Sequence, residues 1–187
     1  MLLSGRAEQE ARRSEDAVRA AGADWTIVRA SWFCQNFSES FFLDGVLDGV
    51  VALPVGDVRA PFVDADDIAD VATAALTEPG HASRLYEVTG PRLLSFAEAM
   101  QEVADATGRE LRFQPVPLDD YTAELERLDV PRDLVALIAY LFTEVLDGRN
   151  ASLADGVRQA LGRPPRDFRD YARATAATGV WDAVRTA

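Results

Sequence analysis

The sequence predicts an α/β protein that is the C-terminal part of a doubly wound parallel sheet, followed by a mostly helical lobe. Two short apolar runs, 25–28 and 85–88, have the character of buried parallel strands, and helical patterns lie before and between them. From residue 117 on, the patterns are helical throughout. Because two strands alone have unpaired edges and cannot cover their flanking helices, we expect several further βα units ahead of Ser4.

Local signals justify each element in order. Gly22 and Gly108 supply C-terminal stops for the helices that precede them, and Ser95 with Glu98 forms a capping box. Pro131 suits a first helical turn. The expected elements are a helix over 8–21, a strand over 25–28, a helix over 38–47, extended runs over 50–55 and 60–63, a helix over 64–76, a strand over 85–88, a helix over 95–108, an extended run over 111–116, and helices over 119–128, 131–146, 152–161 and 167–176.

Composition excludes several classes of function. A net charge of -12 argues against a nucleic-acid-binding surface, because such a surface needs clustered cations. All 19 basic residues are arginine, so no lysine is available for a Schiff base. With one cysteine and one histidine, the chain has few side chains from which to build a His/Cys metal site or a Cys-His relay. With no apolar run that could span a bilayer and no possible internal disulfide, we expect a cytoplasmic protein with neither membrane nor metal contacts.

The segment after the strand at 25–28 is where the sequence predicts a pocket, because ligands of open parallel sheets bind outside the carboxyl ends of the strands. Its rings Trp32, Phe33 and Phe37 could stack on a flat ligand or pack the corner between strand and helix. Asn36 could hold a substrate oxygen or cap a helix. The sequence singles out no catalytic residue.

Other polar residues near this segment are interpreted as structural. Arg29 at the strand end is expected to pair with a neighbouring carboxylate, and Cys34 to be a small buried apolar group. The acidic cluster Asp64, Asp66 and Asp67 is expected to cap the next helix, since an acidic first turn suits the positive end of the helix dipole.

Four ordered segments resemble the NmrA-like, atypical short-chain dehydrogenase/reductase family. Residues 25–37 resemble the family segment "ytilRpgwFmeNf", 61–69 resemble "pfvdvdDiA", 86–98 resemble "yeltGpe.lsfaEa", and 162–168 resemble "GrpPrtf". The resemblance runs from about residue 8 to residue 181. Among branches, the chain looks most like bacterial relatives of the ergot-alkaloid reductases of the festuclavine-dehydrogenase type.

The resemblance implies a Rossmann-like domain that binds NADP or NAD, with a remnant over 1–91 that carries lobe insertions at about 38–63, and a helical substrate-binding lobe over 92–187. It implies hydride transfer from NAD(P)H to a small unsaturated acceptor such as a quinone or an imine. The nicotinamide would lie against Ala30, Ser31, Trp32 and Phe33, and the acceptor against Phe33, Asn36 and Phe37.

Two alternatives remain open beside this function. Some members of the family, such as NmrA itself, sense the dinucleotide and regulate a protein partner without turnover. The chain could also be an autonomous domain that binds a small ligand or forms a homodimer through a sheet edge or the 131–146 helix.

The sequence departs from the family pattern in two places. No two glycines are spaced G-x-G, so the glycine-rich phosphate loop is absent from this sequence. The position of a lysine that many members carry falls near Ala11. We therefore expect an N-terminally truncated member that does not bind a dinucleotide appreciably by itself.

Overall fold

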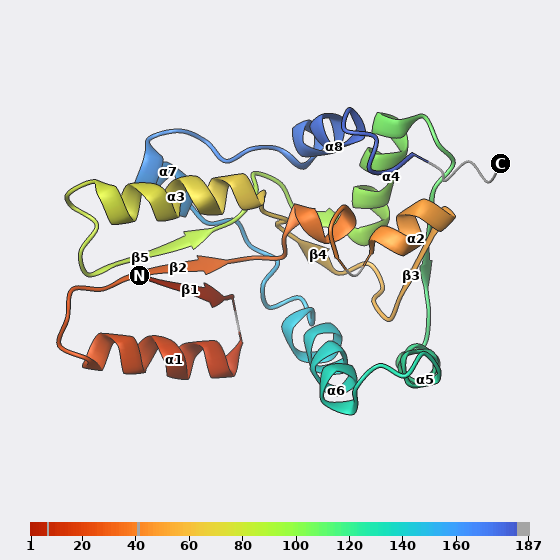
Figure 1. Cartoon of the computed structure of the whole chain (residues 1–187), viewed down its shortest axis with the longest axis horizontal. Coiled ribbons are helices and arrows are strands. Elements are labelled where there is room, and N and C mark those ends of the chain that lie inside the picture. Colours follow the sequence, from red (N-terminus) through yellow and green to blue (C-terminus); the bar gives the residue numbers. More distant parts are fainter. Residues whose placement is uncertain (7, 41, 183–187) are drawn as a thin grey trace.

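The computed structural model describes residues 1–6, 8–40 and 42–182, and it confirms an α/β fold with a parallel sheet (Figure 1). None of the helices described is long and apolar enough to cross a bilayer. In order, the elements are β1 (Leu2–Gly5), α1 (Gln9–Ala20), β2 (Thr26–Ala30), the 3-10 turn η1 (Cys34–Phe37), α2 (Leu43–Asp48), β3 (Val50–Leu53), β4 (Arg59–Ala60), α3 (Ala65–Thr77), β5 (Arg84–Val88), β6 (Leu94–Ser95), α4 (Phe96–Thr107), β7 (Arg112–Pro115), α5 (Leu118–Arg127), α6 (Arg132–Tyr140), the π-helical turn η2 (Leu141–Val145), α7 (Gly156–Leu161) and α8 (Phe168–Ala176).

Three parallel strands form the main sheet in the order β1–β2–β5. Helix α1 lies on one side of the sheet, and α3 and α7 lie on the other (Figure 1). The register pairs Gly5 with Ala30, so the carboxyl ends of β1 and β2 stop at the same level. Strand β1 has no counterpart in the sequence analysis, because a four-residue strand with two apolar residues is too short to show a period.

The other end of the molecule is a lobe with two small sheets and one aromatic core. Strand β3 pairs with β7 in parallel, and β4 pairs with β6 in antiparallel fashion. These pairs bring the segment that follows η1 together with residues 94–115. Helix α7 is different, because it packs against β5 and α3 of the main sheet.

The predicted helix caps are confirmed. The Asp64 carboxylate accepts a hydrogen bond of 3.0 Å from the Asp66 amide at the start of α3. At the start of α4, Ser95 and Glu98 form both bonds of the capping box, and Gly108 ends that helix with a φ of 68°. The N-terminal caps satisfy backbone amides that the helix itself leaves free, and the Gly108 amide donates to the Ala104 oxygen.

Three expected helices differ in the structure. The segment 38–47 is not one helix, because the turn η1 has ended at Phe37 and the helix α2 begins only at Leu43; residue 41 lies outside the described residues. The 131–146 helix ends in the π-helical turn η2. The 152–161 helix begins only at Gly156, because the backbone oxygens of Asn150, Ser152 and Ala154 accept side-chain hydrogen bonds from Arg6 and Thr89 instead of helical ones.

A buried ion-pair network joins α1 to all three strands of the main sheet. Glu15 on α1 is 1% exposed, and its carboxylate accepts hydrogen bonds from Ser4 Oγ at 2.7 Å and from Arg29 Nε at 2.9 Å. On the other side, Arg29 Nη1 donates to Glu87 Oε1 at 2.8 Å. The pairing of Arg29 with carboxylates is therefore confirmed. The hydrogen bonds from Arg29 lower the pKa of Glu15 against the opposing effect of burial.

Gly156 is required where α7 meets β5. A Cβ at this position would overlap the backbone oxygen of Glu87. We expect Gly156→Ala to lower the free energy of unfolding by about 2 kcal/mol or more, because rigid backbone must shift on both sides. Gly56→Ala is the matched control, since a Cβ there meets nothing within 4 Å, and its effect should stay within about 0.5 kcal/mol. Urea unfolding measures both, and equal effects would show that the α7–β5 approach is loose.

Glu15→Gln should destabilise the fold in a pH-dependent way. We expect the free energy of unfolding to fall by about 2 kcal/mol at pH 7. This is less than the ~3–5 kcal/mol typical of removing one partner of a buried pair, because Arg29 retains its ion pair with Glu87. Because the pKa of Glu15 is lowered in the folded state, its carboxylate stabilises the fold at any pH above the unfolded-state pKa of about 4.5. This stabilisation is lost as the pH falls through the folded-state pKa. The difference between the two proteins should therefore shrink as the pH falls below about 4.5.

The matched control for this substitution is Glu10→Gln, because Glu10 lies on the same helix with its side chain 79% exposed. Its effect should be below about 0.5 kcal/mol. Thermal unfolding across the pH range measures both variants. A difference between wild type and Glu15→Gln that does not change with pH would contradict the assignment.

Candidate functional site

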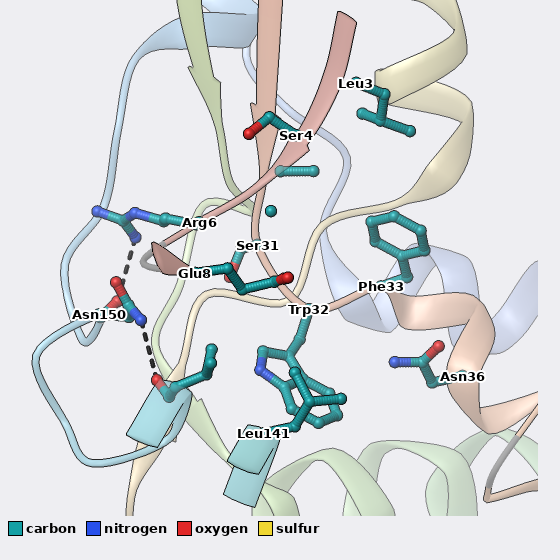
Figure 2. Close-up of a pocket in the computed structure, with 13 residues that line it drawn as sticks. Leu3, Ser4, Arg6, Glu8, Ser31, Trp32, Phe33, Asn36, Leu141 and Asn150 are labelled. Atoms are coloured by element: carbon teal, nitrogen blue, oxygen red, sulfur yellow. Dashed lines mark hydrogen bonds between the residues drawn. The ribbon is translucent and has the colours of Figure 1, made fainter. Parts of the chain in front are cut away.

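A cavity of about 330 Å³ opens at the carboxyl ends of β1 and β2 (Figure 2). This volume lies at the lower end of the range for small-ligand sites. Its wall has three parts: Leu3, Ser4, Gly5, Arg6 and Glu8 from β1 and the turn into α1, then Ala30, Ser31, Trp32, Phe33 and Asn36 from the segment after β2, and lastly Leu141, Val145 and Asn150 from η2 and the loop after it.

Five of the six residues that the sequence predicts for the ligand site therefore lie together around one cavity. They are held there by backbone hydrogen bonds to neighbouring segments. The Ser31 amide donates to the Val88 oxygen at 3.2 Å, which extends the pairing of β2 with β5. Trp32 and Cys34 then pair with Val63, through bonds of 2.8 and 2.9 Å. The corner after β2 is thus a fixed, extended backbone.

Gln35 fastens this corner to the start of α3. Its side-chain oxygen accepts from the Ala65 amide at 2.9 Å, and its amide nitrogen donates to Asp64 at 2.8 Å. The side chain of Gln35 thereby points away from the cavity. Since the next residue, Asn36, lies on the other side of the η1 turn, its amide lines the cavity. Among the residues that the structure describes, none forms a hydrogen bond with the Asn36 side chain.

Trp32 joins the cavity to the aromatic core of the lobe. Its ring centroid lies 5.6 Å from that of Phe142 and 6.3 Å from that of Phe42, to which it is nearly parallel. The ring is half-buried, and its remaining surface faces the cavity. Because one side is packed against other rings, its orientation is fixed before any ligand binds.

Phe37 occupies a different place from the one that the sequence suggested. Its ring is 0% exposed and packs within 5.1 Å of Phe42 and 5.4 Å of Phe168, centroid to centroid. Its backbone oxygen accepts a 2.8 Å hydrogen bond from the Trp181 indole. The turn η1 directs Phe37 into the lobe, so it does not line the cavity. Phe37 packs the corner, which was the alternative to ligand contact.

Arg6 and Asn150 close one side of the cavity. Arg6 donates to the backbone oxygens of Asn150 at 3.1 Å and Ser152 at 2.6 Å, and to the Ser152 hydroxyl at 2.8 Å. The Asn150 amide donates in turn to the Val145 oxygen at 2.9 Å (Figure 2). The wide π-helical turn places both Leu141 and Val145 on the cavity, and such turns are frequent at functional sites.

Glu8 extends across the cavity from the turn between β1 and α1 (Figure 2). Its carboxyl lies directly above Gly5, where a Cβ would overlap it. Burial raises the pKa of Glu8 above its usual value. Sequence reasoning missed Gly5, Arg6 and Glu8, because it did not assign β1. A strand over 2–5 would have placed all three at the carboxyl edge of the sheet.

The acidic cluster and the cysteine have structural roles, although the Asp67 carboxylate binds arginines and does not cap the helix as expected. Asp64 caps α3, and Asp67 is fully buried against the guanidinium groups of Arg163 and Arg166, at 2.8 and 2.6 Å. Cys34 is 1% exposed, and burial raises the pKa of its thiol. Over the described part of the chain, no group of three or more His, Cys, Asp or Glu side chains is placed to hold a metal ion.

The chemistry of the cavity suits a flat ring with a polar edge. Small residues, Gly5, Ala30 and Ser31, form the floor at the strand ends, and the rings of Trp32 and Phe33 stand beside them. An aromatic wall stacks on planar groups, and the free amide of Asn36 can donate to or accept from a carboxamide or a carbonyl oxygen. These features fit a nicotinamide ring and a planar acceptor.

Comparison with known proteins identifies the family of the chain. The model of the NmrA-like family matches residues 12–161. The chain is 32% identical to an NAD(P)H azoreductase from Xenophilus azovorans over 88% of its own length and 57% of that protein. It is 29% identical to festuclavine synthase I from Penicillium roqueforti, over 81% of the chain and 53% of that protein. The chain thus spans about half the length of these curated relatives.

Solved structures show the same fold. The Citrobacter triphenylmethane reductase complexed with NADP(H) superposes with a TM-score of 0.76 at 20% identity, over 92% of this chain and 63% of that one. The NADPH-dependent quinone oxidoreductase from Escherichia coli, complexed with NADPH, gives a TM-score of 0.75 at 19% identity, over 88% and 58% of the two chains. The family model covers well over half of the chain, and the chain therefore belongs to the NmrA-like family.

Proposed function

We propose that this chain forms the nicotinamide and acceptor end of an NAD(P)H-dependent reductase that transfers hydride to a small unsaturated acceptor such as a quinone or an imine. The observation that carries the proposal is the cavity at the carboxyl ends of β1 and β2, where small strand-end residues lie beside two aromatic rings. Ligands of parallel α/β sheets bind at this edge. The azoreductase and the NADP(H) complexes among the similar proteins support the same reaction class.

Each residue of the cavity has a proposed role. Ala30 and Ser31 let the nicotinamide ring approach the backbone closely, and Trp32 and Phe33 flank it. Phe33 and Asn36 contact the acceptor, and the Asn36 amide orients a carbonyl or imine group. Phe37 takes no direct part, because its ring is sealed in the lobe. NAD(P)H supplies the hydride when bound, and the chain's own residues position the two planar groups and keep water from between them.

We further propose that the 187-residue chain does not hold a dinucleotide by itself. A cavity of about 330 Å³ has room for ring systems, and the sequence has no G-x-G turn that could cradle a pyrophosphate. In this class of fold, the phosphates supply much of the contact with the protein.

A titration with NADPH should therefore show no saturable binding to the chain below millimolar concentration, whether followed by NADPH fluorescence or by calorimetry. The full-length E. coli quinone oxidoreductase, solved with NADPH, is the positive control. Micromolar, saturable binding to this chain would refute the expectation and would point to a phosphate site that the cavity does not include.

A second function is favoured by a specific observation, which is that no tyrosine, lysine or histidine side chain lines the cavity among the described residues. A protein without such proton donors can sense the redox state of a dinucleotide and regulate a partner. The partner, or a second copy of the chain, would meet the edge of β1 that pairs with no other described strand, where Leu3 is 49% exposed.

A chimera distinguishes the reductase from the sensor. The part of the Xenophilus azovorans azoreductase that precedes the matched region is joined to this chain, which supplies a complete cofactor site. We expect NADPH oxidation with at least one acceptor from a panel of quinones, imines and azo dyes, and a loss of about tenfold in kcat/KM for Trp32→Ala, whose ring is part of the wall. NADPH binding without turnover across the panel, together with a partner captured by pull-down, would favour the sensor.

A further inference from the structure

We propose that Glu8 is the proton donor of this site, a role that rests on the proposed reductase function. In its protonated form the Glu8 carboxyl donates a hydrogen bond to the acceptor atom on which negative charge develops, and then transfers its proton to that atom. The juxtaposition that carries the proposal is a carboxyl folded over Gly5 into an aromatic-walled cavity (Figure 2).

The position of the Glu8 side chain is built into the fold. Glu8 is the residue that precedes helix α1, with an extended backbone at φ -79° and ψ 128°, yet its carboxyl accepts no hydrogen bond from the first amides of that helix. The short side chains of Ser, Thr, Asp and Asn ordinarily cap a helix from this position, whereas the longer side chain of Glu8 does not. Here the carboxyl crosses instead to the space above Gly5, which any larger residue would fill.

Within the described part of the chain, no charged group forms an ion pair with Glu8. Arg6 is the other charged residue of the cavity wall. Its guanidinium donates hydrogen bonds to the backbone oxygens of Asn150 and Ser152, and its Nη2 lies 3.8 Å from Glu87 Oε2. Across the described residues, Glu8 forms neither an ion pair nor a side-chain hydrogen bond. A carboxyl in such a place retains its proton to a higher pH than an exposed one, because burial disfavours its charged form.

The other titratable or charged groups near Glu8 lie on α1, α6 and η2, and they are engaged or exposed. Arg12, one turn further along α1, is exposed. The hydroxyl oxygen of Tyr140 accepts a 3.3 Å hydrogen bond from the Gln9 amide, and Glu144 faces solvent with Arg149 at 3.9 Å. The Glu15 carboxylate is held by Arg29 and Ser4. Of the described residues, Glu8 alone presents a carboxyl to the cavity.

The step balances in atoms and electrons. A hydride from the dihydronicotinamide carries two electrons to one atom of the acceptor C=O, C=N or N=N system, and the π bond breaks as its electron pair moves to the partner oxygen or nitrogen. The Glu8 O–H bond then breaks, and the proton goes to that atom. Glu8 is left as a carboxylate, which regains a proton from water through the open mouth of the cavity. General acid catalysis of this kind works best when the acid's pKa lies near the working pH.

The test is the binding of menadione, a neutral quinone, to the 187-residue chain without cofactor, measured by calorimetry between pH 4 and pH 8. Affinity should fall about tenfold as the pH rises through the pKa of Glu8, because deprotonation removes one hydrogen-bond donor and introduces a charge facing the quinone oxygen. Glu8→Gln keeps a donor without a titratable proton, so its affinity should stay near the low-pH value of wild type at every pH.

Two further variants complete the design. Gly5→Ala should abolish the pH dependence, because its Cβ displaces the carboxyl, and Glu10→Gln on the outer face of α1 should behave as wild type. A pH-independent wild type, or a Glu8→Gln variant that keeps the pH dependence, would overturn the role of Glu8 while the proposed reductase function stands. Absence of menadione binding to wild type at any pH would count against the acceptor site itself, and both proposals would fall.

Discussion

The buried carboxylate of Glu15 is the interaction on which the site depends, because it joins the elements that the cavity needs side by side. The carboxylate accepts hydrogen bonds from Ser4 on β1 and from Arg29 on β2, and Arg29 also donates to Glu87 on β5. Strand β1 has only four residues and lies at the edge of its sheet, so its own ladder hydrogen bonds hold it weakly. The network fixes β1 in register with β2, and that register sets Gly5 level with Ala30 and forms the cavity floor.

The lobe contributes rigidity to the site through Trp32 and η2. One side of the indole is packed against Phe42 and Phe142, so the lobe core sets the angle of the cavity wall. In η2, the hydrogen bond from the Leu146 amide to the Leu141 oxygen spans five residues, and the widened turn brings Leu141 and Val145 to one side. Sheet and lobe thus meet at this cavity, and each supplies part of its wall.

Much of the fold and one of the three parts of the cavity wall could be predicted from the sequence. The strand at 25–28, the helices with clear caps and the corner after the strand have strong local signals, and α3 and α4 begin where Asp64 and Ser95 indicate. The rule that ligands bind at the carboxyl ends of parallel strands placed a pocket after this strand, where the cavity lies.

The remainder depends on contacts between distant residues. Strand β1 is decided by pairing with β2, so Gly5, Arg6 and Glu8 were not assigned to the site. Arg6 also holds the backbone at Asn150 and Ser152 out of the helix that local propensity favours. Phe37 is turned into the core by η1, a short turn that aromatic spacing alone does not reveal.

The central claim is that the cavity at the ends of β1 and β2 is where this chain binds its ligand. Amide chemical-shift mapping of the isotope-labelled chain, titrated with menadione and with reduced nicotinamide mononucleotide, tests this claim most directly. The account predicts that the shifts gather at Gly5, at 30–33 and at Asn36. Shifts gathered instead at the separate hollow beside His81, Arg84 and Gln159, or no saturable shifts at all, would contradict it.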